Sequence, residues 1–232
     1  MRVLPILFNG EMVRAILDGR KTVTRRICKD GDDYSVPDMR FYTANKRIYA
    51  VHSYADKEHK NKLSLVERTC PICPGDILYV RETWAHHKNA EGGIIFRARC
   101  PRKLAETQKW YPSIHMPKEA ARIWLKVTDV RIEKLQKIDE QEVAKEGINS
   151  HVHPKADYFD ENQREMFAEL WNSTLKRADL SHYGWDANPW VWVIEFEQCE
   201  RPKEIRDEAG IKISGEQVAD CGPAGGADTA TS

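Results

Sequence analysis

The sequence predicts an α+β fold made mainly of strands, in which a small β-barrel carries flanking short helices. Four short segments have the alternating or continuous apolar pattern of β-strands: 77–81, 94–99, 122–133 and 190–197. Helical patterns are fewer, and each of them is short. A chain with several short strands and few helices is typical of a small barrel.

The first helix is expected over residues 9–18. Apolar residues recur there at helical spacing, as Met12 and Ile16 do. Asn9 is a candidate N-cap, and Gly19 is placed to end the helix in the left-handed conformation. The segment is therefore predicted to be a short amphipathic helix.

Two further helices have recognisable starts or ends. Asp139 and Glu142 have the spacing of a capping box, and Gly147 is the predicted stop of the helix that they begin. Another helix is expected over about residues 160–175, with Asp160 in its own capping box. The apolar face of this second helix is expected to contain Met166, Phe167, Leu170 and Trp171.

The chain is predicted to contain one domain, residues 1–203. Residues 30–68 are polar and irregular and are expected to form an insertion or a flap, in which only Tyr42–His52 resembles a hairpin. Residues 204–232 contain small polar residues and glycines and are predicted to be a disordered tail. A domain of this length can bury a sizeable core.

Composition limits the function classes. Of the 232 residues, 36 are Lys or Arg and 36 are Asp or Glu, so broad non-specific coating of DNA is not expected. With 41% apolar residues and no long charge-free run, no membrane-spanning helix is expected. The six cysteines without an apolar leader predict reduced thiols in a cytoplasm.

Residues 19–26 carry the strongest local signal of function. They include four cations and two hydroxyl side chains: Arg20, Lys21, Arg25, Arg26, Thr22 and Thr24. Over residues 14–29 six cations stand against a single acid, Asp18, within a neutral chain. Such a cluster suits a phosphate or another anion, and its hydroxyls suit contacts to a base or sugar, or acyl transfer. Alternatively, the cations only complement the negative end of the preceding helix.

The segment Ile6–Arg26 resembles the opening of an ASCH domain, a small β-barrel of the PUA-like superfamily. Later blocks resemble the longer phage and prophage members of that family, in family order: Pro74–Trp84, Tyr111–Gln136, Ala144–Ile148 and Asn188–Glu197. The chain departs from the family at residues 30–68, at Cys70–Cys73 and after about residue 203. The resemblance implies a PUA-like barrel over most of residues 4–200.

The resemblance also implies a catalytic set. One enzymatic branch of the family deacylates N4-acetylcytidine with a Lys, a Thr and a Glu, which fall here on Lys21, Thr24 and Glu146. Amide hydrolysis needs a nucleophile, a base and a group that stabilises the oxyanion, and these three side chains would meet much of that need. The alternative is that Lys21 and Glu146 form a structural or ligand-binding ion pair while Thr24 caps a turn.

Arg81, Glu82 and Trp84 follow directly on a predicted strand. Neighbouring residues of a strand point to opposite faces, so only one of Arg81 and Glu82 is expected to line a cleft. Trp84 is a candidate for stacking on an exposed base. The alternative for Trp84 is an ordinary place in the core.

Other candidates are weaker. Ser113 and His115 lie in a family block, and His115 is interpreted as a hydrogen-bonded strut in preference to a catalytic base. Asn188 precedes the last strand and is a candidate for lining the cleft. Cys70 and Cys73 have zinc-ligand spacing, but a single such pair is half a site, so no metal and no other cofactor is expected.

The predicted cleft lies between residues 19–26 and 146–147. The first hypothesis is a protein that binds RNA, DNA or a modified nucleoside, with the phosphate on Arg25 or Arg26 and the base near Trp84. The second is an amidohydrolase acting on N4-acylated cytidine. The third, a ribonuclease, comes only from other members of the family that the chain resembles.

Overall fold

The structure is a computed structural model that describes residues 1–28, 39–44, 47–55, 63–88, 90–148 and 163–202. Its main sheet has five strands in the order β1-β6-β9-β10-β2. The strands are β1 (Val3–Leu7), β2 (Val23–Ile27), β6 (Ile77–Arg81), β9 (Trp124–Lys134) and β10 (Trp190–Cys199). Only β1 and β6 run parallel. The fold is therefore α+β with mainly strands, as predicted.

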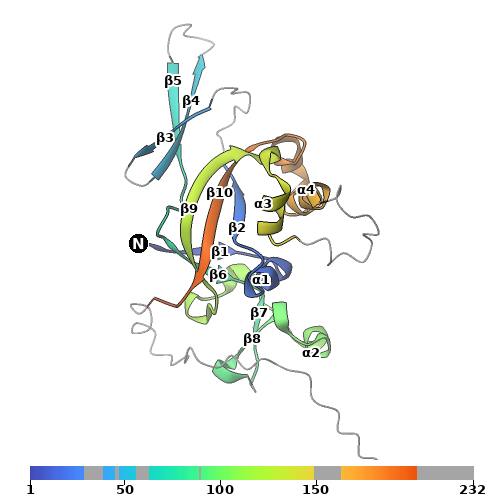
Figure 1. Ribbon diagram of the computed structural model, residues 1–232. Coiled ribbons are helices and arrows are strands. Elements are labelled where there is room, and N and C mark those ends of the chain that lie inside the picture. The colour runs from blue at the N-terminus through green and yellow to red at the C-terminus, as the bar shows by residue number, and fades with distance from the viewer. Residues whose placement is uncertain (29–38, 45–46, 56–62, 89, 149–162, 203–232) are drawn as a thin grey trace, which may run out of the picture.

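The sheet is strongly curved, and its two edges approach one another. The long antiparallel pair β9–β10 bends through the view in Figure 1, and its register shifts between Glu195 and Phe196. At the edges, the Arg26 guanidinium on β2 donates to the carbonyl oxygen of Leu7 on β1 at 2.9 Å. In the part of the chain that the structure describes, β1 and β2 are not paired by a backbone ladder, so the predicted closed barrel is not confirmed.

Helix α1 (Gly10–Leu17) forms where the sequence predicts it. The Asn9 side chain accepts a hydrogen bond from the Met12 amide at 2.8 Å, and Gly19 ends the helix with a φ of 72°. The inward residues Val13 and Ile16 are fully buried. Helix α1 thus closes over the concave side of the sheet (Figure 1).

Helix α3 (Glu140–Lys145) begins as predicted, because Asp139 accepts a hydrogen bond from the Glu142 amide at 2.8 Å. The Glu142 carboxylate, predicted to complete the capping box, instead binds the guanidinium groups of Arg25 and Arg131. Ion pairs with residues distant in sequence therefore replace the local hydrogen bond that the Glu142 side chain would make in a capping box.

Helix α4 (Gln163–Ser173) confirms the third predicted helix, with Phe167 and Trp171 buried on its inner face. Its predicted cap, Asp160, lies outside the described residues, as does the predicted tail at 204–232. Among the helices that the structure describes, none is both long and apolar enough to cross a membrane.

The segment predicted as a strand over 94–99 is shorter than expected. Strand β8 (Ile94–Phe96) pairs with β7 (Trp84–His86), and the chain then turns through a 3-10 helix, Arg97–Arg99. The turn is stabilised by a hydrogen bond of 2.9 Å from the Arg97 amide to the carbonyl oxygen of Thr83. Two further short α-helices are α2 (Arg102–Thr107) and α5 (Leu180–Tyr183).

The polar region predicted as an insertion forms a second sheet of three strands. These are β3 (Met39–Ala44), β4 (Arg47–Ala55) and β5 (Leu63–Thr69), in the order β3-β4-β5. The hairpin expected at Tyr42–His52 is confirmed by the pairing of Tyr42 with Tyr49. The expectation that the remainder is irregular is wrong at 63–69, because pairing with β4 makes this polar segment a strand.

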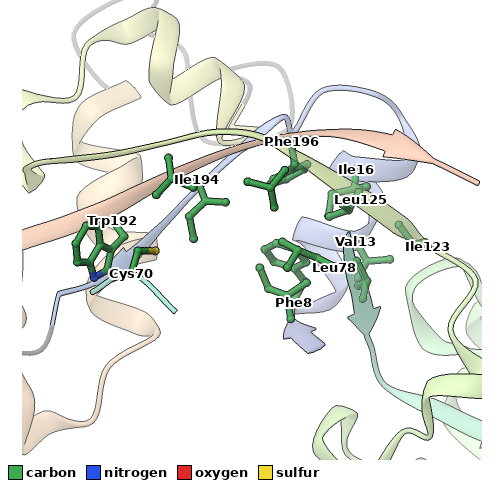
Figure 2. Close-up of a cluster of buried hydrophobic side chains, with 14 of the residues drawn as sticks. Phe8, Val13, Ile16, Cys70, Leu78, Ile123, Leu125, Trp192, Ile194 and Phe196 are labelled. Carbon is green, nitrogen blue, oxygen red and sulfur yellow. The ribbon is translucent and has the colours of Figure 1, made fainter. Parts of the chain in front are cut away.

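Three clusters of buried side chains cover both faces of the main sheet. The first, under α1, includes Phe8, Leu78, Leu125 and Phe196 (Figure 2). The second lies under α3 and α4, and the third lies beside β7. Trp124, on the face of β9 opposite Leu125, is 3% exposed because it packs in the third cluster.

Gly147 is expected to be essential for packing α3 against α1. Its φ is +88°, and an added Cβ would stand 2.6 Å from the Ala15 Cβ and 3.0 Å from the Lys21 Cβ. We expect Gly147→Ala to lower the free energy of unfolding by about 3 kcal/mol in urea denaturation, through backbone strain plus overpacking.

The matched control is Gly75→Ala. Gly75 has a φ of +86°, and an added Cβ would meet nothing within 4 Å. We therefore expect Gly75→Ala to lower the free energy of unfolding by about 1 kcal/mol, through backbone strain alone. Equal losses in the two variants would contradict the close approach at Gly147.

Candidate functional site

Residues 19–26, which we call the basic cluster, contact the end of α3 directly, as the sequence predicts. Lys21 and Glu146 form an isolated antiparallel bridge, and the Thr22 amide donates to the carbonyl oxygen of Lys145 at 2.9 Å. The Arg20 guanidinium donates to the carbonyl oxygen of Gly147 at 2.7 Å. Three consecutive residues of the cluster are thus attached to the last turn of α3.

Lys21 and Glu146 form a buried ion pair. The Lys21 ammonium contacts the Glu146 carboxylate and also donates to the Glu146 carbonyl oxygen at 3.0 Å. The two side chains are 0% and 5% exposed. Burial lowers the pKa of Lys21, the Glu146 carboxylate opposes that shift, and Arg26 and Arg25 lower the pKa further. Desolvation is therefore a larger cause of the lowered pKa than the cationic neighbours are.

Arg25 extends this ion pair into a network. Its guanidinium donates to Glu146 at 3.1 Å and to Glu142 at 2.6 Å. Arg131 joins the network through three carboxylates, those of Glu133, Glu142 and Glu195. Arg25 is 4% exposed and its charge is matched by acids, so it is poorly placed to hold the phosphate that the sequence assigned to it.

Thr24 lies on the other face of β2 from Val23 and Arg25, because side chains alternate along a strand. It is 2% exposed. The Lys21 ammonium and the Arg26 guanidinium both lie beside the Phe8 ring, at 5.7 Å and 5.3 Å from its centroid. The side chains implied for catalysis are thus buried, and the cleft predicted between residues 19–26 and 146–147 is filled by their contacts.

The remaining members of the basic cluster are more accessible. Thr22 is exposed, and Arg20 pairs with Asp18 at 3.0 Å. Arg26 is half-buried and bonded to the carbonyl oxygen of Leu7. The cations of residues 19–26 therefore act mainly on the protein itself.

A cavity of about 380 Å³ lies at the N-terminal end of α1. Its walls come from α1, the β6–β7 connection, the turn after β8, and α2. The lining residues are Asn9, Gly10, Glu11, Arg14, Glu82, Thr83, Arg97, Ala98 and Ala105. Carboxylates and guanidinium groups both border this space, so it suits a ligand with polar groups of both kinds.

Glu82 is the most deeply buried charged residue of the cavity wall. It is 1% exposed, and its two carboxylate oxygens accept hydrogen bonds from Arg122 at 2.8 Å and 2.9 Å. Burial raises the pKa of Glu82, and the Arg122 guanidinium opposes that shift. Arg81 is absent from the described lining and donates instead to the carbonyl oxygen of Ile114 at 3.2 Å. Of these two residues, only Glu82 is in the described lining of this cavity, which is not the cleft predicted between residues 19–26 and 146–147.

Trp84 belongs to the core. It is 7% exposed and packs in the third buried cluster with Tyr79 and Trp124. The interpretation of Trp84 as a surface for stacking a base is therefore not supported. The neighbouring rings of His86 and Tyr111, which contact it, are the exposed ones.

The structure gives Ser113, His115 and Asn188 no place in the described cavity lining. Ser113 is half-buried and His115 is exposed in a 3-10 turn, so the expected role of His115 as a strut is not seen. Asn188 has a φ of 45°, and its side-chain oxygen accepts from the Gln136 amide at 2.9 Å. Asn188 thus shapes the turn before β10.

Cys70 and Cys73 are both buried near Arg2. Cys70 is part of the core under α1, and burial raises the pKa of its thiol to about 11. The Arg2 guanidinium lies 3.3 Å from the Cys73 sulfur. Among the residues placed by the structure, no group of three or more His, Cys, Asp or Glu could hold a metal ion.

Sequence reasoning missed a second basic segment, residues 97–109. It contains one acid, Glu106, and five exposed cations: Arg97, Arg99, Arg102, Lys103 and Lys109. Trp110 and Tyr111 follow at once. The local charge count that identified residues 14–29 would have found this segment, which also combines basic residues with aromatic ones.

The Lys21–Glu146 pair is expected to be strongly coupled. Lys21→Met or Glu146→Gln alone leaves a charge in the interior and should cost about 3–5 kcal/mol of unfolding free energy. In a double-mutant cycle measured by denaturation, the double variant should lose about 1–3 kcal/mol less unfolding free energy than the two single losses add up to.

The exposed pair Lys126–Glu197 supplies the control for this cycle. Its charged atoms are 3.5 Å apart and its side chains are 53% and 58% exposed, so a coupling below about 1 kcal/mol is expected for Lys126→Met with Glu197→Gln. If the coupling energy of Lys21 and Glu146 is no larger than that of Lys126 and Glu197, the buried contact adds little to stability.

Comparison of this chain with protein-family models, with curated proteins and with solved structures gives no match. The resemblance to ASCH domains therefore rests on the ordered sequence blocks alone. The contact between Lys21 and Glu146 agrees with the arrangement that the resemblance implies, and the burial of both residues limits what they can reach. The family thus stays a prediction from the sequence.

Proposed function

We propose that this chain is a nucleic-acid-binding or nucleotide-binding protein of the ASCH type, which recognises an exposed or modified base in the cavity beside α1. The observation that carries the proposal is the juxtaposition in this cavity of Glu82 with two arginines, Arg14 and Arg97. A nucleotide has the matching polarity, since its base can present N–H donors and its phosphate is an anion.

The size and chemistry of the cavity support this proposal. Pockets for small ligands typically measure about 300–1,000 Å³, and this cavity of about 380 Å³ lies at the lower end. A carboxylate accepts hydrogen bonds from the exocyclic amine of cytosine. Arg122 binds both oxygens of Glu82 and so fixes their orientation, and its charge opposes the rise in the Glu82 pKa that burial causes. Guanidinium groups in turn match phosphate oxygens.

The buried network of Lys21, Arg25 and Glu146 has a supporting role in this proposal. It attaches β2 to α3, whereas the phosphate-binding role predicted for residues 19–26 passes to the arginines of the cavity wall. The curved sheet with α1 following its first strand supports a PUA-like fold as part of the same proposal.

The binding test uses Arg97→Ala. Arg97 is exposed and lines the cavity, so its removal should weaken affinity for single-stranded RNA or DNA without unfolding the protein. In fluorescence anisotropy over a range of salt concentrations, the slope of log affinity against log salt should fall by about one unit.

Lys126→Ala is the control, because Lys126 is an exposed cation outside the described lining of the cavity. It should leave affinity and salt slope almost unchanged. The proposal fails if the wild-type protein shows no salt-sensitive affinity for RNA, DNA or a nucleotide.

A second candidate is deacylation of N4-acylated cytidine, favoured by the buried Lys21. Burial lowers the pKa of Lys21 next to Glu146, which is the direction that a lysine acting as a base requires. Thr24 would be the nucleophile and lies three residues away on the next strand. Because the Lys21 side chain has no exposed surface, this reaction requires that the contact between β2 and α3 open for substrate.

The deacylation candidate predicts release of cytidine from N4-acetylcytidine, followed by chromatography. Thr24→Val and Lys21→Ala should abolish turnover by removing the nucleophile and the base, while Lys126→Ala should retain it. Absence of turnover in the folded wild-type protein would count against this candidate and leave the binding proposal intact.

A further inference from the structure

A second group of exposed cations lies on residues 97–109, a segment that the basic cluster does not include. Residues 97–109 carry five cations and one acid in a chain whose formal charges cancel. Two of these cations pair with acids at the surface, Arg99 with Asp18 at 2.8 Å and Arg102 with Glu106 at 2.9 Å. Exposed pairs of this kind are weak, so they leave the guanidinium groups open to another anion.

An aromatic group lies beside this basic segment. The Trp84 ring is buried, and the rings of His86 and Tyr111 pack on it with centroid distances of 4.9 Å and 5.2 Å. His86 and Tyr111 are themselves 5.9 Å apart. Both are exposed, Tyr111 at 37%, so they present ring surface to solvent. We call His86 and Tyr111 the aromatic platform.

The aromatic platform is held in place by the backbone. Tyr111 bridges to Trp84, with amide-to-carbonyl hydrogen bonds of 2.8 Å and 3.3 Å in the two directions. The Gln108 side chain donates to the carbonyl oxygen of His86 at 3.2 Å. The rings are therefore pre-positioned, which lowers the entropy cost of binding on them.

The platform and the cavity share a wall. Arg97 and Ala105 belong to the basic segment and also line the cavity. The Trp110 indole donates to the carbonyl oxygen of Ala105 at 2.8 Å, and Tyr111 follows it. Strand β7, which carries His86, begins directly after the cavity residue Thr83. In Figure 1, α2, β7 and β8 lie together, away from α3 and α4.

We infer that the aromatic platform and residues 97–109 bind single-stranded nucleic acid, with a base stacked on the Tyr111 ring next to the nucleotide held in the cavity. The His86 ring, inclined at 76° to the Tyr111 ring, would contact the edge of that base. This inference rests on the proposed function and narrows its ligand to an unpaired strand. Stacking on aromatic rings is tolerant of sequence, and cations beside the rings follow the phosphate backbone. The base in the cavity would supply selectivity, while the platform and the basic segment would supply affinity.

The test compares an oligomer with a monomer. Affinity for a fluorescein-labelled single-stranded RNA of about eight nucleotides, and for the DNA of the same sequence, is measured by anisotropy. Affinity for a mononucleotide is measured by calorimetry. Tyr111→Leu should weaken oligomer binding by about fivefold to 150-fold, the range found for loss of one stacked base, and should change mononucleotide binding by less than about twofold.

Tyr111→Phe is the matched control, since it keeps the ring and should keep oligomer affinity. His86→Ala provides a second variant that does not depend on the Tyr111 backbone bridge, and it should also weaken oligomer binding. Thermal melting checks that each variant is folded.

The inference is overturned if folded Tyr111→Leu and His86→Ala bind the oligomer as the wild type does while Arg97→Ala binds it weakly. That outcome leaves the proposed function standing. Equal affinity for the duplex form of the same oligomer would also overturn it, because stacking on the platform needs unpaired bases. Failure of the wild type to bind monomer or oligomer would remove both proposals together.

Discussion

The buried ion pair between Lys21 and Glu146 is the interaction on which the other features of the structure depend. It attaches the first residues after α1 to the last turn of α3, although the two side chains are 125 positions apart in the chain. Arg25 contacts the same carboxylate, so the middle of β2 is also held against the end of α3. Breaking such a pair leaves a charge in the interior, and closing it fixes how β2 and α3 meet.

The same pairing explains why the basic cluster at residues 19–26 is unavailable to an external anion, whereas the basic segment at residues 97–109 is available. The cations at residues 21 and 25 meet carboxylates supplied by β9 and by α3 with its C-terminal end, both distant in sequence. Residues 97–109 follow a strand of only three residues and turn over the surface, where one acid lies among five cations. The difference lies in which partners the fold brings to each segment.

Local patterns predicted the elements that depend on local physics. Asn9 and Asp139 cap their helices as expected, and both predicted glycine stops, Gly19 and Gly147, have positive φ. The strand predicted at 77–81 is also present, as β6. Local patterns did not predict what distant segments supply. Trp84 and Trp124 are covered by the cluster beside β7, and Leu63–Thr69 becomes a strand because β4 pairs with it.

Trp84 is buried, but the molecule still has an exposed aromatic surface, which is formed by the rings that pack on Trp84. Trp84 supplies the apolar support on which Tyr111 and His86 rest, and the backbone bridge between Trp84 and Tyr111 fixes that layer. A ring packed on a buried ring loses little freedom when a base stacks on it, since its position is already fixed. Trp84 is therefore a core residue, the alternative weighed from the sequence, and it supports the two exposed rings to which we assign the stacking role.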